Sequence, residues 1–180
     1  ATAAGHTVTT IEGLMSAQMG VMWMTIDVYG MPVHAAYAHT GIAAIDFANH
    51  LVAELRKLEA LWNRPERRHP MYCAHDHPIN FNLGRFAGGE WTSSVSTHCR
   101  VDMRLGFYPG RSCAEVRAEV EALLARAHAA HPQRSSVRYE VTYQGFQAEG
   151  CVVELQVPAM QQLMQCHRDI AGEEPPVRAT

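Results

Sequence analysis

The hydrophobic pattern of the first third of the chain predicts a strand followed by a helix. Residues 19–29 are rich in β-branched and aromatic residues and carry apolar residues on both alternating faces. That pattern is typical of a central strand covered on both sides. Residues 42–62 instead repeat their apolar positions at helical spacing, which predicts an amphipathic helix. We expect Thr40 to be its N-cap and Pro65 to end it.

The middle of the chain predicts two further strands and a second helix. Residues 79–83 form a short apolar run, and the three glycines within 84–89 predict a turn or a bulged connection. A long strand is expected over 93–107. Ser112 and Glu115 then form a capping box that opens a helix running to about residue 130. Residues 137–143 alternate apolar and polar side chains, as a half-exposed strand does.

The order of these elements, β-α-β-β-α-β, predicts the fold class. It is that of a ferredoxin-like α+β sandwich, with a four-stranded antiparallel sheet and two helices on one face. In this arrangement the short strand 79–83 lies at an edge of the sheet. A bare edge must be covered or used for assembly, so we expect the domain to self-associate through this edge strand and the long first helix, 42–62.

The two ends of the chain differ in character from this middle. Residues 1–18 are small and polar without a sustained period, which predicts a linker or a frayed terminus. Residues 151–157 are strand-like. Residues 158–171 read as a helix with Pro158 in its first turn and Gly172 as its stop.

Composition narrows the class of protein. The chain has 180 residues, enough for one domain with tails, and a formal net charge of −3, which argues against nucleic acid and anionic membranes as partners. Its five cysteines form no close pair, so a disulfide framework and a cysteine-based zinc site are not predicted. Free thiols and the lack of a targeting or membrane-spanning segment predict a cytoplasmic protein. Without an initiator Met, we expect the sequence to be a segment of a longer protein.

Histidines provide the candidate chemistry. His34 lies on the connection 30–41 between the first strand and the first helix, where a side chain can be held in place for binding or catalysis. His75, Asp76 and His77 are the one tight cluster of metal-ligating residues, but spacing supplies no third ligand. We therefore predict no metal site, and a solvated loop at 75–77. Patterns for a nucleophilic triad, a P-loop or a dinucleotide site are absent.

Two motifs give the chain a family resemblance. The first is Gly30, His34, Ala35, Gly41 and Ala44 in this order; the second is the Gly88-Gly89 pair, followed by Asp102-Met103-Arg104 and the turn Pro109-Gly110. Over residues 19–150 they resemble the lid, or dimerisation, domain of the co-catalytic zinc aminoacylase family. That family includes acetylornithine deacetylase, succinyl-diaminopimelate desuccinylase, aminoacylase and glutamate carboxypeptidase. The chain departs from the family pattern in having Ser93 for its Asn, Ser96 for its Pro, and a shorter spacing to Arg104.

The resemblance implies a role for the segment and for two residues. Residues 19–150 would be the lid of a homodimeric amidohydrolase or peptidase that cleaves N-acyl amino acids or small peptides. Residues 1–18 would be a linker from a missing catalytic domain holding two zinc ions, and 151–180 would return to that domain. His34 would act as a catalytic residue in the partner subunit's active site, and Arg104 would bind a substrate carboxylate. The segment alone would be inactive.

Two other interpretations remain open. One is a free-standing ferredoxin-like module whose function is dimerisation. The other is a metal-binding domain that uses His75 and His77.

Overall fold

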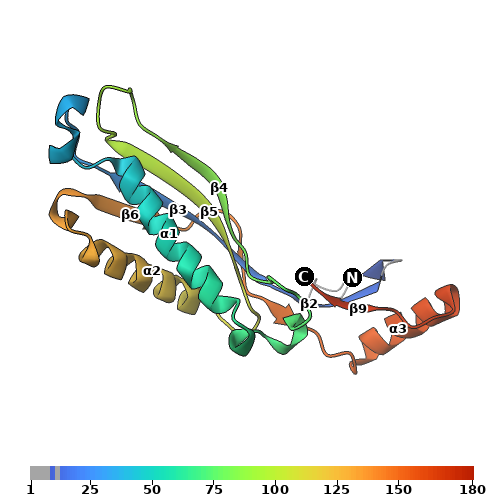
Figure 1. Cartoon of the computed structure of the whole chain (residues 1–180). Helices are drawn as coiled ribbons and strands as arrows, with labels where there is room; N and C mark the ends of the chain where they lie inside the picture. The colour runs from blue at the N-terminus through green and yellow to red at the C-terminus, as the bar shows by residue number, and fades with distance from the viewer. Residues whose placement is uncertain (1–8, 11–12) are drawn as a thin grey trace.

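The computed structural model describes residues 9–10 and 13–180. It has an elongated shape with two parts (Figure 1). A long sheet with two helices forms the larger part, and a small sheet with one helix lies at the end of the molecule that holds β2 (Gly13–Gln18) and β9 (Val177–Ala179). The predicted linker 1–18 falls partly on residues 1–8 and 11–12, which lie outside the described residues.

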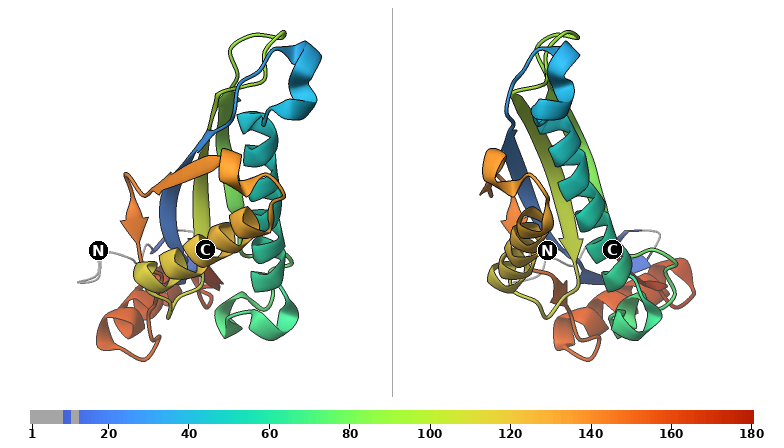
Figure 2. Two further views of the ribbon diagram at one scale, coloured as in Figure 1. Left: turned by 90° about the vertical axis from the view of Figure 1, so that its left-hand side faces the viewer. Right: turned by 60° about the vertical axis from the view of Figure 1, so that its left-hand side comes forward.

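The larger part confirms the ferredoxin-like fold. Its four main strands are antiparallel and follow the spatial order β4-β5-β3-β6, with a short fifth strand beside β3. Both helices cover the same face of this sheet (Figure 2). The elements are β3 (Gly20–Tyr29), α1 (Ala44–Trp62), β4 (Phe81–Gly88), β5 (His98–Phe107), α2 (Cys113–Ala130), β6 (Arg138–Thr142) and β7 (Gln147–Ala148).

The core lies between the sheet and the helices. It is built from alternate side chains of β3 and β5 and from one face of α1. Its members include Met22 and Ile26 of β3, Val101 and Leu105 of β5, and Phe47, Leu51 and Leu55 of α1. The prediction that β3 is covered on both sides is wrong. Its second face is open and partly polar, because Thr25 and Asp27 point there and bond to β5: the Thr25 hydroxyl donates to Asp102 (2.7 Å), and the His98 ring lies 2.8 Å from Asp27.

β4 is an edge strand, as the sequence predicted, but it is longer than predicted. It starts at Phe81 and continues through the glycine-rich stretch to Gly88, with a bulge where the register shifts between Leu83 and Arg85. The bulge was one of the two expectations for 84–89; the turn comes only at Gly89, whose φ is +85°. β5 begins later than predicted because the residues before His98 form a loop.

Helix α1 is capped from another part of the chain. The predicted N-cap, Thr40, is wrong: this residue ends a short 3-10 helix, η1 (Ala35–Thr40), and its hydroxyl donates to the Tyr37 carbonyl (2.8 Å). The N-cap position is Ala43, which has no side-chain acceptor. Ser96 supplies it instead, since its hydroxyl oxygen accepts from the Ile45 amide (3.2 Å). For α2, the predicted capping box of Ser112 and Glu115 is present.

The small part joins the two ends of the chain. Residues 13–18 were predicted to lack regular structure, but they form strand β2 (Gly13–Gln18). β2 pairs with β1 (Thr9–Thr10), β8 (Cys151–Val152) and, in parallel, β9 (Val177–Ala179), so the pattern of one strand alone could not reveal it. The strand-like run 151–157 is regular only in β8. Helix α3 (Pro158–Ala171) is confirmed, and Gly172 ends it with φ +76°.

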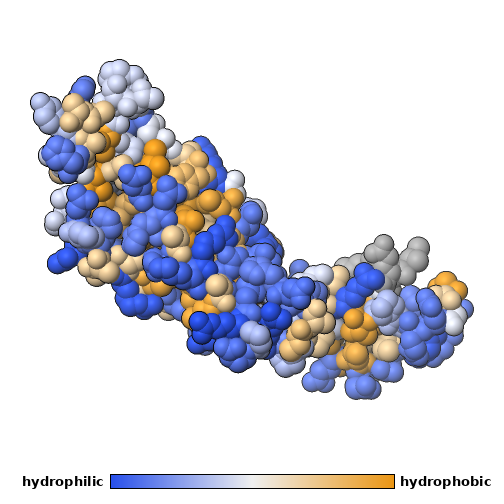
Figure 3. All heavy atoms as spheres, viewed as in Figure 1, coloured by the Kyte–Doolittle hydropathy of each residue, from blue (hydrophilic) through white to orange (hydrophobic). Residues whose placement is uncertain are grey.

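The face of the molecule seen in Figure 3 is mainly hydrophilic. In the space-filling view, apolar residues appear in small groups over both parts (Figure 3). Within the described residues, every helix is too short or too polar to cross a lipid bilayer.

Candidate functional site

The loop that carries His34 lies at the end of the molecule far from the small sheet (Figure 1). It runs beside the loop before β5, and the two loops are hydrogen bonded like a pair of strands. Val95 donates its amide to the Val33 carbonyl (2.9 Å), and Ala35 donates to the Ser93 carbonyl (2.9 Å). His34 is therefore held from both sides, as expected for a loop that positions a functional group.

The ring of His34 is exposed but oriented. Its Nδ1 accepts a hydrogen bond from the Ala36 amide at 3.2 Å. A backbone amide can only donate, so Nδ1 carries no proton in this arrangement. The neutral ring then has its proton on Nε2 and can offer that N–H to a ligand.

Two aromatic side chains are exposed at the same end of the molecule. Tyr37 on η1 is 64% exposed, and Trp91 on the loop before β5 is 68% exposed. The second loop is held by its own bonds: Glu90 accepts from the amide of Thr97 (3.2 Å) and from its hydroxyl. The Thr97 side chain and backbone hold the pKa of Glu90 below its usual value. Sequence reasoning did not single out this pair of aromatic residues.

The contacts of Ser93 and Ser96 bear on two of the departures from the family motif. Ser93 contributes to the loop pairing through its backbone carbonyl, which any residue could supply. The departure at Ser96 is different, because the Ser96 hydroxyl caps α1 and a proline has no such group. Within the described residues, these contacts show no role for the Ser93 side chain.

Arg104 lies on the open face of the sheet, between Trp23 of β3 and Asn82 of β4 in the strand register. It lines a hollow of about 600 Å³ with these two residues. The other arginine of the hollow, Arg100, is paired with Asp102 at 3.1 Å. Within residues 13–180 no carboxylate pairs with Arg104. Its guanidinium is therefore available to an anionic ligand.

The structure does not bring His34 and Arg104 together. Arg104 faces Trp23, whereas His98, six residues earlier on β5, faces Tyr29 at the other end of β3. At the rise of a β-strand this is a separation of roughly 20 Å, and His34 lies beyond Tyr29. One small substrate cannot contact both residues of the same subunit.

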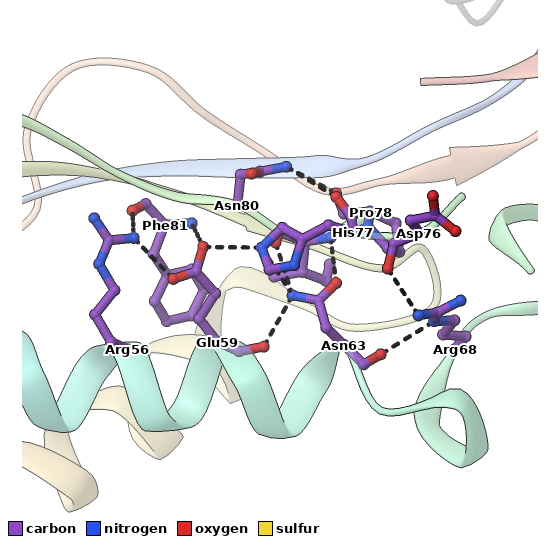
Figure 4. Close-up of polar contacts among 10 residues, drawn as sticks. Arg56, Glu59, Asn63, Arg68, Asp76, His77, Pro78, Asn80 and Phe81 are labelled. Carbon is purple, nitrogen blue, oxygen red and sulfur yellow. Dashed lines mark hydrogen bonds and ion pairs between the residues drawn. The ribbon is translucent and has the colours of Figure 1, made fainter.

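The three residues of the cluster at 75–77 have different neighbours, and Figure 4 shows those of Asp76 and His77. His77 turns towards α1, where its Nε2 lies 3.5 Å from a carboxylate oxygen of Glu59. Asp76 accepts from Arg68 through its backbone carbonyl (2.8 Å), and the His75 ring lies against Tyr72. In the part of the chain that the structure describes, no three His, Cys, Asp or Glu side chains converge as metal ligands.

Comparison with known proteins adds the family. The sequence model of the peptidase dimerisation domain, M20_dimer, matches residues 16–132. The chain belongs to this family. The resemblance in the two motifs is thereby confirmed, and the M20 match covers the ferredoxin-like part from β3 to α2.

Solved structures share the fold at low sequence identity. A tripeptidase from Staphylococcus aureus matches with a TM-score of 0.64 and 15% identity, over 92% of this chain and 39% of that one. An aminobenzoyl-glutamate utilization protein from Klebsiella pneumoniae gives 0.56 and 17%, over 93% and 38%. A hydantoinase/carbamoylase family amidase from Burkholderia ambifaria gives 0.61 and 14%, over 92% and 36%. The present chain spans less than two fifths of the length of each.

Proposed function

We propose that this M20 dimerisation domain is the lid of a zinc-dependent amidohydrolase or peptidase. The observation that supports it most is His34, held by two paired loops with Nδ1 occupied and Nε2 free to donate. The names of the structural neighbours, a tripeptidase and an amidase among them, fit hydrolysis of an amide bond. The two zinc ions would lie in a catalytic domain outside this segment.

In this proposal His34 stabilises the charge that forms during amide hydrolysis. Attack on the carbonyl carbon places negative charge on the carbonyl oxygen, and a donor fixed in advance stabilises it by about 3–4 kcal/mol. The Nε2–H of His34 is such a donor. It needs no rearrangement, because the Ala36 amide already fixes the tautomer.

His34 would act in the active site of a second subunit. Arg104 is the proposed ligand of the substrate carboxylate, and it lies roughly 20 Å along the sheet from the His34 end of its own subunit. Both residues can contact one N-acyl amino acid or small peptide only when they come from different subunits. A homodimer would therefore be required for activity.

The free edge of β4 is the proposed dimer contact. Two copies joined edge to edge would form a continuous sheet with eight main strands, four from each copy, and pair backbone groups that are otherwise left to water. The small part supports the proposed division of the chain. β2 and β9 lie side by side, so residues 1–18 and 151–180 would lead to and from the catalytic domain at one place.

A mixing experiment in the full-length enzyme tests this function. A His34→Ala subunit is combined with a subunit defective only in its zinc ligands. Each homodimer should be inactive, and the heterodimer should recover activity at one of its two sites. No recovery, with heterodimers verified by mass spectrometry, would place His34 in its own subunit's site. A fully active His34→Ala homodimer would leave a dimerisation module without a catalytic contribution.

A further inference from the structure

The first part of the β4 edge is closed by helix α1. Phe81 directs its backbone groups away from β5, towards the helix (Figure 4). Its amide donates to the Glu59 carboxylate at 2.8 Å, and its carbonyl accepts from Arg56. Arg56 also pairs with Glu59 at 2.8 Å, so the two side chains hold each other in place.

Asn63 closes the preceding outward position in the same way. Its side-chain amide donates to the Ile79 carbonyl (2.8 Å), and its side-chain oxygen accepts from the Ile79 amide (2.9 Å). Asn63 and Glu59 are both buried, at 8% and 7% exposure. These bonds cannot be replaced by water without opening the contact between α1 and β4.

The rest of the edge is free. The Asn80 carbonyl accepts from Gly106, and the Gly89 amide donates to His98, so residues 80 and 89 face β5. Backbone groups alternate between facing β5 and facing outwards along an antiparallel strand. Before the bulge, residues 80 and 82 face β5 and Leu83 faces outwards; after it, residues 85, 87 and 89 face β5, and Phe86 and Gly88 face outwards. In the described part of the chain, no strand other than β5 pairs with β4.

We propose that Arg56 and Glu59 select the stretch of β4 that a second copy of this chain can use. Pairing is confined to residues 83–88, and the two-fold axis of the dimer crosses this stretch. Pairing at Phe81 would displace both bonds and leave the Glu59 carboxylate buried with fewer partners, which is strongly unfavourable. The inference rests on the proposed self-association through β4. It adds the register of the two β4 strands, which is set by the bonds of Arg56 and Glu59 to Phe81, here called the clamp.

Cysteine cross-linking of the 180-residue chain tests the register. In a background in which Cys73, Cys113, Cys151 and Cys166 are changed to Ser, so that only the buried Cys99 remains, one cysteine at a time replaces Asn82, Arg85 or Ala87. For an axis between the midpoint of residues 83 and 86 and residue 88, two copies of residue 85 or of residue 87 lie within about 8 Å, whereas copies of residue 82 lie about 17 Å apart or more. A short thiol cross-linker should therefore join subunits at 85 or 87 and at least about tenfold less at 82.

The clamp itself is tested with Arg56→Ala in the Asn82→Cys background. Removing the guanidinium frees the Phe81 carbonyl, so cross-linking at 82 should rise severalfold. Lys57→Ala is the matched control, since Lys57 is exposed, carries the same charge and bonds only to Glu54 on its own helix. If Arg56→Ala leaves cross-linking at residue 82 unchanged, the clamp is overturned while the dimer stands. The same holds if residue 82 cross-links efficiently when Arg56 is intact. A purely monomeric chain in sedimentation overturns the dimer and the clamp together.

Discussion

At the scale of the residue, His34 is a donor whose position is fixed by its neighbours. In the proposed mechanism, His34→Ala in the full-length protein should lower turnover by about two to three orders of magnitude, because the oxyanion would lose one oriented donor. Steady-state kinetics, zinc content and a thermal melt measure the effect. The control is His39→Ala, because His39 is an exposed histidine of η1, the short helix whose N-cap is His34. Near-normal turnover of His34→Ala would reduce His34 to a turn residue.

Arg104 offers a second test at this scale. Arg104→Gln keeps most of the side chain but removes the charge, so KM for a substrate with a free carboxylate should rise about 10- to 100-fold. Arg85→Gln makes the same change on an exposed residue of β4 outside the hollow and should leave KM unchanged. Equal KM values in both variants would separate Arg104 from substrate binding.

At the scale of the element, the sequence predicted whether a segment is a helix or a strand better than it predicted where the segment begins and ends. The apolar period of α1 and the capping box of α2 are local, and both were predicted correctly. The errors arise where a segment's structure depends on residues far away in the sequence. Ser96 caps α1 across 51 residues of sequence, and β2 is a strand because β1, β8 and β9 pair with it. His34 was proposed from its motif, but the tautomer that the proposal requires depends on a contact seen only in the structure.

The cap of α1 is testable. Ser96→Ala removes the acceptor for the Ile45 amide and should lower the free energy of unfolding by about 1 kcal/mol. Urea unfolding of the 180-residue chain measures it. Ser94→Ala serves as the control, since the Ser94 hydroxyl is exposed and bonds only to the nearby Trp91 carbonyl. The opposite ranking of the two variants would show that the helix end is satisfied in another way.

At the scale of the whole molecule, three histidines lie where α1 meets the end of α2. The rings of His50, His128 and His131 surround Phe47, and the first and last have ring centres 5.5 Å apart. Burial, then the neighbouring His50 and His128, lowers the pKa of His131 below its usual 6.5. Asp46 is the carboxylate that lines the same hollow as His131. The contact between the two helices therefore favours the uncharged His131 ring.

This predicts a stability that falls in mild acid. In the unfolded chain His131 takes up a proton near its usual pKa, whereas the folded chain resists it, so protonation favours unfolding. The stabilising contribution is complete above about pH 6.5 and is lost as the pH falls below that value. Urea unfolding at pH 7.5 and 5.5 should show the decrease. His131→Gln, which cannot be protonated, should lose less stability between these two values, while His75→Gln in the exposed loop should behave as the unmodified chain. A His131→Gln profile as steep as that of the unmodified chain would assign the pH dependence to other groups.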